Sequence, residues 1–504
     1  MPLTRQAALK SLRTTLEWLG DEVKTITSPV DPILEATAIN KAFDDGPVFL
    51  MDKVVGYPNA RLVASLWGRR DRLCRLLGAA TMKETKNQVL NAIKNPIPAV
   101  EVDEAPVQEV VIPKELVDPF RLLPMVQHTE DDGGRFFGSG VHLITGDVAS
   151  GGSQLSFYRM SFREPTVASI NMVPGGHGDQ LAEQNYESRI PCTVNISPPP
   201  MVEYLGMSFL NAAIFPTVDN ELGAAGALQG SPVEIVRAKT IDGYSVANSE
   251  YVIEGHIVPN QRVWETEKAE QNGSQGTENF HPEWARYMGK AYRARRFEVS
   301  AITHRSDKPI YFVPHLGSMW QWIPWAAANY YELAERLAPG FVQDVTAHTS
   351  LMMWGGIVMQ VKKRRRSDEG LQRNILSAVM GLARGMRLVI VVDDDIDINQ
   401  PEDVLWAIAT RVNPHTDLMY GASGSKGHAY MPAERMSAKE QVSMFEGGIG
   451  IDATVPINAR EHFTRARYPV DKMDFTRWFT VEEIKEMKAM QSEYLRFMGD
   501  TGFA

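Results

Sequence analysis

Two carboxylates in one loop-like segment are the first residues whose spacing suggests chemistry. They are the ends of Glu278-Asn-Phe-His-Pro-Glu283, which follows a strand-like pattern in a Gly- and Asn-rich region. A carboxyl group that is buried there could act as a general acid or base, because burial raises its pKa. A solvated acidic loop is the more ordinary interpretation of the spacing alone.

Two further candidates stand among glycines. His177 lies in Pro-Gly-Gly-His-Gly, where the backbone could approach a ligand closely, and imidazole is a common metal ligand. A loop or capping histidine is the plainer interpretation. Glu221, in Asn-Glu-Leu-Gly-Ala-Ala-Gly-Ala, could face a cofactor, with a simple turn as the alternative. The sequence has no GxGxxG, P-loop, HExxH or GxSxG motif to indicate a better-known site.

The residues around these candidates are patterned as a β-rich domain. Over 106–305, short apolar runs alternate with Gly, Pro, Asn and Asp, which predicts a barrel or sandwich of short strands. These runs are Gly140–Thr145, Thr166–Met172, Val233–Val236 and Tyr251–Ile253. A helical pattern over 318–338, with Trp320, Trp322 and Trp325, predicts a helix that joins two domains.

The pattern changes after residue 341. The apolar run Leu388–Val392, followed by Asp393-Asp394-Asp395, predicts a strand buried on both faces and hence an α/β domain. The same region predicts a strand over Val358–Val361 and helices over Arg373–Gly385 and Asp403–Arg411.

Both ends of the chain predict helices. Near the start, Leu9, Leu12, Leu16 and Leu19 share one face of an amphipathic helix, and a second helix spans 85–99. Near the end, the capping-box pattern Thr480-Val-Glu-Glu483 precedes apolar residues of a last helix, which are Ile484, Met487, Tyr494 and Phe497.

Composition excludes several classes of protein. The net charge of -10 argues against nucleic acid as the main partner. The run Lys362–Arg366 predicts a solvated loop, with a phosphate contact as the alternative. No apolar run approaches the length of about 18 residues that spans a bilayer, and the N-terminus lacks a signal-peptide core. Only two cysteines occur, which favours a reducing, cytoplasmic setting.

Taken in order, segments along nearly the whole chain resemble the UbiD decarboxylase family. Single motifs are weak, but their order is specific. The matching segments are Ser28–Glu35 (PxDPxLE), His128–Arg135 (HxxDGG), Gln154–Arg159 (NxSxxR), Pro174–His177 (PPxH), Asn220–Ala227 (xEAGxxGA), Glu278 with Glu283 (ExxxxE), and Arg387–Ile398 with Asp403–Arg411. The variants NELGxAGAL and QVKKR…DEG are similar to the phenolic-acid decarboxylase branch.

The resemblance implies a cofactor and its ligands. The family uses prenylated FMN, supplied by a separate flavin prenyltransferase, with the phosphate held through Mn²⁺ (or Mg²⁺) and K⁺. The implied metal ligands are Gln154, His177 and Glu221, with Gln154 standing where the family has Asn. Oxygen ligands with one imidazole suit such a hard divalent metal. Ser156 and Arg159 are the other implied cofactor contacts.

The resemblance also implies catalytic roles. Arg159 would hold a carboxylate, Glu283 would deliver a proton to the carbon that loses CO₂, and Glu278 would keep the arginine positioned. The chain departs from the family's EGPxGExxGY segment after a longer insertion, and the departing residues are Asn279, His281, Pro282 and Trp284. His281 is therefore a candidate substrate contact.

The expected activity is non-oxidative decarboxylation of a flat aromatic acid, a hydroxybenzoate or a pyrrole-, furan- or indole-type carboxylate, with reversal under high CO₂ left open. The implied fold is mixed α/β. It has an α/β segment (1–105), a split-barrel flavin-binding domain (106–310), a connecting helix (311–340), a C-terminal α/β oligomerisation domain (341–475) and a last helix (476–504) that reaches a partner subunit.

We expect a homodimer or larger even-numbered assembly, with neither nucleic acid nor membrane as a partner. Two other functions remain open. One is an FMN oxidoreductase on a split barrel, and the other is a non-catalytic subunit of a larger carboxylase.

Overall fold

The structure is a computed structural model, and its chain divides into two compact units at Trp325 and Ala326. It describes residues 3–135, 137–145, 152–173, 176–208, 210, 214–215, 220–284, 286–314, 318–351, 355–382, 386–421, 448–465 and 472–490. The helix predicted over 318–338 is confirmed in its main part, as a short 3-10 turn followed by α11 (Ile323–Leu337). The five predicted domain ranges are finer than this division and stay predictions.

The first unit begins with two short helices, α1 (Arg5–Ala8) and α2 (Leu12–Leu19), where the sequence predicted one. The chain breaks between them because the Ser11 side chain and Thr14 form a capping box that starts a new helix. The predicted leucine face is confirmed, since Leu9, Leu12, Leu16 and Leu19 are all buried.

These helices precede a four-stranded sheet of order β1-β2-β3-β17. Its strands are β1 (Val23–Ile26), β2 (Val48–Met51), β3 (Arg61–Ala64) and β17 (Ile310–Phe312). Three more helices belong to this part of the chain, namely α3 (Glu35–Ala42), α4 (Arg70–Leu77) and α5 (Met82–Lys94). The helix predicted over 85–99 is thus α5, and it ends before Asn95-Pro96 because proline cannot continue a helix.

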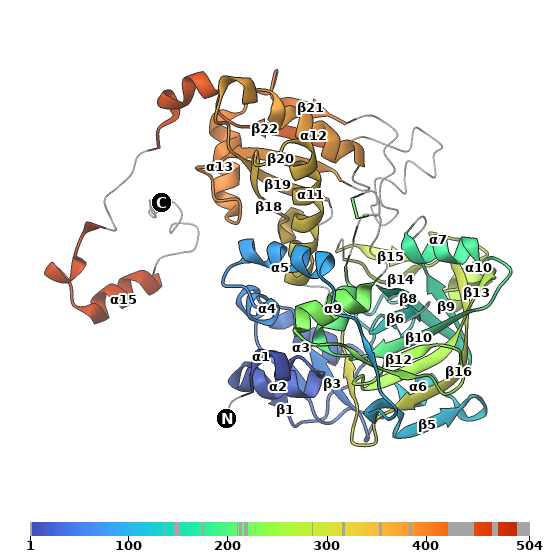
Figure 1. The fold of residues 1–504 in the computed structure, drawn as a ribbon. Helices are drawn as coiled ribbons and strands as arrows, with labels where there is room; N and C mark the ends of the chain where they lie inside the picture. Colours follow the sequence, from blue (N-terminus) through green and yellow to red (C-terminus); the bar gives the residue numbers. More distant parts are fainter. Residues whose placement is uncertain are drawn as a thin grey trace. The chain divides into compact units, whose positions relative to one another are not determined.

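The largest sheet of the first unit is antiparallel and has eight strands (Figure 1). Its strand order is β7-β6-β10-β13-β16-β9-β8, with β5 paired to β16. The strands are β5 (Val110–Pro113), β6 (Gly140–Thr145), β7 (Ser153–Phe157), β8 (Arg159–Glu164), β9 (Val167–Asn171), β10 (Ile190–Ile196), β13 (Tyr251–Trp264) and β16 (Arg293–His304). The two ends of this order, β7 and β8, are joined by the single residue Tyr158, so the sheet must curl back on itself at that corner.

The two sheets share one hydrophobic core. Met51 and Leu62 of the small sheet belong to the same buried cluster as Ile196 and Ile253 of the large one. Period-2 alternation places one face of each strand in that core. The candidate site residues Gln154, Ser156 and Arg159 lie on β7 and β8, on either side of Tyr158.

Smaller elements surround the large sheet. Its satellite strands form a three-stranded sheet, β12-β11-β4, and a hairpin, β14-β15. Their bounds are β4 (Val100–Glu101), β11 (Glu234–Arg237), β12 (Tyr244–Val246), β14 (Asn279–Pro282) and β15 (Met288–Lys290). The helices are α6 (Pro119–Leu122), α7 (His177–Gln184), α8 (Pro200–Gly206), α9 (Glu221–Gln229) and α10 (Glu267–Asn272).

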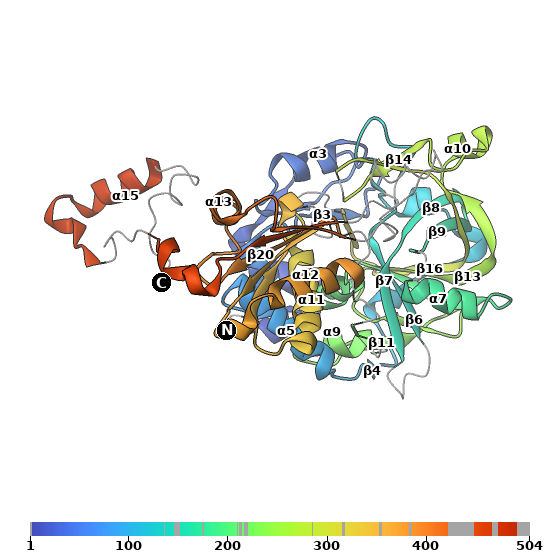
Figure 2. The ribbon, with the colours of Figure 1, turned by 90° about the horizontal axis from the view of Figure 1, so that it is seen from above.

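The second unit is the predicted α/β domain. Its sheet has the order β18-β19-β20-β22-β21, and β19, β20 and β22 are parallel. The strands are β18 (Val342–Thr346), β19 (Gly356–Val361), β20 (Leu388–Asp393), β21 (Leu418–Tyr420) and β22 (Ile449–Ala453). Figures 1 and 2 show α12 (Leu371–Leu382) and α13 (Pro401–Arg411) on opposite sides of β20, which explains its continuous apolar run.

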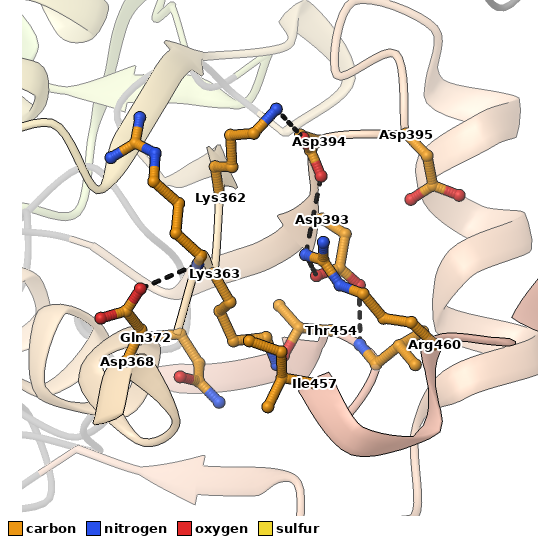
Figure 3. Close-up of polar contacts among 12 residues, drawn as sticks. Lys362, Lys363, Asp368, Gln372, Asp393, Asp394, Asp395, Thr454, Ile457 and Arg460 are labelled. Carbon is orange, nitrogen blue, oxygen red and sulfur yellow. Dashed lines mark hydrogen bonds and ion pairs between the residues drawn. The ribbon is translucent and has the colours of Figure 1, made fainter. Parts of the chain in front are cut away.

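The carboxyl ends of these parallel strands hold a network of charges (Figure 3). Lys362 pairs with Asp394 at 2.7 Å and stays half exposed. Lys363 is buried, and its ammonium donates to Thr454 at 3.0 Å and to Glu369 at 3.2 Å. The solvated loop predicted for this run is therefore wrong at Lys363, whose charge is part of the interior.

The last described segment, 472–490, differs from the rest of the second unit. It contains α15 (Val481–Met490), and the predicted capping box is confirmed, because Thr480 and Glu483 exchange hydrogen bonds at the start of this helix. Every residue of 472–490 is exposed except the partly buried Ile484. Tyr494 and Phe497 lie outside the described residues. Among the helices that the structure describes, none is long and apolar enough to cross a membrane.

Candidate active site

The guanidinium of Arg159 lies at the corner where the large sheet turns from β7 into β8. Its Nε and Nη2 donate to the two carboxylate oxygens of Glu265 at 2.8 and 2.7 Å. Its Nη1 donates to Oε1 of Glu283 at 2.6 Å. All three side chains are at most 7% exposed, so these ion pairs are largely screened from water.

Both carboxylate oxygens of Glu265 accept two hydrogen bonds each. It directly follows β13, and besides the two bonds from Arg159 it accepts from the Asn171 side chain at 3.0 Å and from the Tyr292 backbone at 2.7 Å. Two carboxylate oxygens have about four lone-pair sites, and four donors occupy them. Glu265 can therefore orient the arginine but has no acceptor position left for a substrate.

Glu283 is positioned by the β14-β15 hairpin. It follows β14, its backbone closes a turn with Tyr287 and Arg286, and its Oε1 accepts from Nη1 of Arg159. Gly289 of the paired strand β15 lies against it. A Cβ at position 289 would come within 2.6 Å of Glu283 Cγ and 2.7 Å of its Oε1. The side chain of Glu283 thus needs glycine at that position.

Aromatic rings complete the setting of the arginine. Phe280 lies 5.2 Å and Tyr292 5.9 Å from the guanidinium carbon, both within cation–π range. The backbone carbonyl of Lys290 accepts a further bond from Nη2 at 2.9 Å. Arg159 is therefore fixed by β13, β14 and β15 together.

Glu278 does not join this cluster. Its carboxylate accepts from Asn272 at 2.7 Å and pairs with Lys268 at 2.7 Å, near the surface beside α10. The hydrogen bond to Lys268 lowers the pKa of Glu278. The structure therefore brings Arg159 and Glu283 together, as the sequence predicted, but gives the arginine-holding position to Glu265 instead of Glu278.

Sequence reasoning missed Glu265 because the spacing matched another residue. The family pattern asks for two glutamates five positions apart, and Glu278 meets it, whereas Glu265 lies earlier in the chain, directly after β13. The available signal was the end of the long strand pattern at Trp264, where a polar residue turns toward the rim of the sheet.

The residues implied as metal ligands lie along β7 and the helices beside it. Gln154 is 5% exposed, and its amide nitrogen donates to Ser156 Oγ at 2.5 Å and to the Tyr158 hydroxyl at 3.0 Å. Burial raises the pKa of Tyr158 to about 12, so this hydroxyl stays protonated. The amide oxygen of Gln154 is buried and has no hydrogen-bond partner within the described ranges.

Glu221 and His177 begin two of the helices that contact β7, α9 and α7. Glu221 is the first residue of α9, is 6% exposed, and one of its oxygens accepts from the Leu155 backbone. A bridge between Ser153 and Asn220 fixes the start of α9 beside the strand. His177 is the first residue of α7, which contacts both β7 and β13.

A glycine ties α7 to the same corner. A Cβ at Gly178 would lie 2.0 Å from the Tyr158 hydroxyl, the group that holds Gln154. Gly178, Gln154 and Tyr158 therefore belong to one packed region, and His177, which is itself exposed, is the neighbour of Gly178 in the chain.

These residues fit a hard divalent metal. An orphaned amide oxygen, a buried carboxylate and an imidazole are the donor types that Mn²⁺ or Mg²⁺ accepts. In the described part of the chain, no three histidine, cysteine, aspartate or glutamate side chains gather as a metal site, and the implied set contributes only two residues of those types. The amide of Gln154 would thus be the decisive third ligand.

Models of one carboxy-lyase family match the chain in three stretches. They are described as the N-terminal domain (residues 19–89), the Rift-related domain (99–318) and the C-terminal domain (320–453) of 3-octaprenyl-4-hydroxybenzoate carboxy-lyase. Among curated proteins, gallate decarboxylase of Lactiplantibacillus plantarum is 29% identical over 91% of this chain and 96% of its own.

Solved structures agree with this match. The apo 3,4-dihydroxybenzoic acid decarboxylase of Enterobacter cloacae has a TM-score of 0.81 at 28% identity and covers 94% of this chain and 99% of its own. The UbiD-class enzyme HmfF of Pelotomaculum thermopropionicum, in complex with FMN, has a TM-score of 0.79 at 26% identity over 93% of this chain and 100% of its own. The three domain matches follow one another along the chain and span both units, and the chain therefore belongs to the UbiD family of carboxy-lyases.

Proposed function

We propose that this chain releases CO₂ from a hydroxylated aromatic acid, with prenylated FMN as its cofactor. One observation carries the proposal. A buried arginine is held by one fully occupied carboxylate, Glu265, and also donates to Oε1 of a second carboxylate, Glu283. This is an arrangement of one positioning carboxylate and one acid around a carboxylate-binding group.

The relatives support the substrate and cofactor classes. Gallate and 3,4-dihydroxybenzoic acid, named for two of them, are both hydroxylated benzoates. HmfF has been solved with FMN and, in an evolved dimeric form, with prenylated FMN. An ordinary FMN oxidoreductase is disfavoured by membership of a carboxy-lyase family.

Arg159, Glu265 and Glu283 would have different roles in the reaction. Arg159 would bind the substrate carboxylate on its Nη1 side, next to Glu283, while Glu265 keeps the guanidinium plane fixed. When bound, prenylated FMN supplies the sink for the electrons that CO₂ leaves behind. Glu283 would then donate a proton to the carbon that carried the carboxylate.

Gln154, His177 and Glu221 would hold Mn²⁺ or Mg²⁺ against the cofactor phosphate, and Ser156 would support Gln154, to which it is already bonded. A K⁺ ion and supply of the cofactor by a flavin prenyltransferase belong to the same proposal. We also propose the split-barrel description for the curled sheet of the first unit, and an oligomerisation role for the second unit.

The function is tested by co-expression with a flavin prenyltransferase, followed by a screen of aromatic acids for CO₂ release by the purified chain. We expect Glu283→Gln to lose about 10² to 10⁴ in rate, since glutamine keeps the shape but cannot supply the proton. Flavin absorbance should be unchanged. Activity close to that of the parent would remove Glu283 from the mechanism, and a parent that releases no CO₂ alone would favour a role as a subunit of a larger carboxylase.

The two glutamates at positions 265 and 278 provide a matched pair. Glu265→Gln should lower kcat/KM by about 10- to 100-fold, the equivalent of about 1.5–3 kcal/mol for a hydrogen bond to a charged group. Glu278→Gln should leave kcat/KM within about twofold, because its partners lie outside the arginine cluster. Equal losses in both variants would contradict this division, and thermal unfolding would control for instability.

His177→Ala should release metal and flavin together, because removal of one ligand weakens an ion that bridges the protein to the cofactor phosphate. Metal analysis by mass spectrometry and flavin absorbance measure the two losses. His256→Ala, a change of the same kind elsewhere on the large sheet, is the control. Unchanged metal and flavin contents in the His177 variant would refute the ligand assignment.

We propose a homodimer or larger even-numbered assembly in which α15 contacts the partner subunit. The exposed side chains of 472–490 include Trp478, Phe479, Val481 and Met487, an apolar group that soluble proteins rarely leave uncovered. Light scattering should give an even-numbered assembly for the full chain and a smaller species for a chain cut before Phe479. A clean monomer at micromolar concentration would disprove the proposal, and a dimer that survives the cut would move the interface elsewhere.

A further inference from the structure

Asn171, the last residue of β9, lies directly opposite Arg159, the first residue of β8. Side chains alternate between the two faces of such a strand pair, and directly opposite residues share a face. The next pair along, Met160 and Ile170, belongs to the hydrophobic core. Arg159 and Asn171 therefore project together from the other face, where both bond Glu265.

The two side chains meet on one oxygen of the same carboxylate. Nε of Arg159 donates to Oε1 of Glu265 at 2.8 Å, and Nδ2 of Asn171 donates to that oxygen at 3.0 Å. A carboxylate that binds a guanidinium accepts hydrogen bonds, so the amide of Asn171 must present its nitrogen to it and not its oxygen. The asparagine thus supplies a neutral donor at a position where an acceptor would fail.

The four hydrogen bonds to Glu265 differ in what they fix. Two come from Arg159, and these set the geometry within the ion pair but not the place where the pair lies. The other two come from outside the pair, from the Asn171 side chain on Oε1 and from the Tyr292 backbone on Oε2. One outside donor on each oxygen fixes both the position of the carboxylate and its rotation. Without Asn171, one outside bond would remain, about which the carboxylate could turn.

We propose that Asn171 is a positioning residue, which fixes the carboxylate of Glu265 and, through it, the guanidinium that bonds Glu283. For decarboxylation the proposal rests on the proposed function, because Arg159 is taken there to bind the substrate carboxylate. In this role Asn171 touches neither substrate nor flavin. Its effect on the rate is nevertheless large, since a misplacement of about 1 Å in a substrate-binding group can cost about 10²-fold.

The first test is a double-mutant cycle on the flavin-loaded enzyme, read as kcat/KM for CO₂ release. Asn171→Leu keeps a side chain of similar size without a donor, and should lower kcat/KM by about 5- to 50-fold. In a Glu265→Gln background the same change should cost less than about threefold, because the NH₂ group of the new amide opposes one pair of donors and the arrangement is already broken. Losses that multiply would show that Asn171 acts independently of Glu265, and would overturn the proposal.

Ser169 offers a matched control on the same face of β9. It lies opposite Ser161 in the strand pair, and its hydroxyl accepts from the Ser161 backbone at 3.2 Å. Ser169→Ala also removes a polar group next to β8, but one that does not bond Glu265. It should leave kcat/KM within about twofold. A loss equal to that of Asn171→Leu would assign the effect to the strand pair as a whole and overturn the proposal.

Asn171→Asp gives a readout that a loss of stability alone would not move. The introduced carboxyl group has nearly the shape of the amide. When ionised it opposes the carboxylate of Glu265, and when protonated it can donate to Oε1 again; the neighbouring carboxylate raises its pKa. The kcat/KM of this variant relative to the parent should therefore rise by about tenfold between about pH 8 and about pH 5. The same ratio for Asn171→Leu should not change with pH, and a flat ratio for Asn171→Asp would contradict the proposal.

Crystal structures of the parent and of Asn171→Leu separate this proposal from the proposed function. In the variant, the carboxylate of Glu265 should be shifted or turned while β8 and β9 keep their pairing. An unmoved carboxylate overturns the positioning role, whatever the activity. A parent that releases CO₂ from no acid overturns the proposed function, and the two structures then still decide what Asn171 does.

Discussion

One buried guanidinium between two carboxylates is the interaction on which the rest of the site depends. Arg159 carries one positive charge, and Glu265 and Glu283 carry two negative charges when ionised. Burial lowers the pKa of the neighbouring His281 well below its ordinary value, which disfavours a positive charge on that ring. A substrate carboxylate would add a third negative charge. Like charges at such short range and low exposure cannot all persist, so the complex is favoured when one carboxyl group holds a proton. Four donors surround the carboxylate of Glu265 and hold it in place beside the arginine.

The large sheet brings the site residues together because its two end strands, β7 and β8, meet at Tyr158. The residue before it ends β7, which carries Gln154, and the residue after it begins β8 with Arg159. Tyr158 itself bonds Gln154 and packs under α7, where His177 begins. Gln154, a proposed metal ligand, and Arg159, which bonds the proposed acid Glu283, are therefore only a few residues apart in the chain. Glu265 arrives from the end of β13, and Glu283 arrives through the β14-β15 hairpin.

Local patterns predicted what depends on neighbours along the chain, and failed where partners come from elsewhere. The run Leu388–Val392 and the pattern at Thr480 predicted β20 and the start of α15, because burial on two faces and a capping box are local properties. The pairing of Arg159 with Glu283 came from the ordered family motifs, and the structure confirms that the two residues meet. Glu265 was missed because only the folded sheet shows which glutamate meets the arginine. Lys363 was predicted to be solvated for a similar reason, since its partner Thr454 lies 91 residues away.

Helix α10 and strand β14 lie between Glu265 and Glu283, and their position has a consequence for how this site can change over time. Both carboxylates are anchored outside the intervening residues, one at the end of β13 and the other against Gly289 of β15. Lengthening a loop between fixed anchors adds only about 0.6 kcal/mol of closure entropy for each doubling of its length. Residues 266–278, which precede β14, can therefore gain, lose or exchange residues while the reacting groups keep their geometry. Insertions or substitutions in this short segment can therefore change which acids the site accepts. The residues that carry out the reaction, Arg159, Glu265 and Glu283, can stay the same.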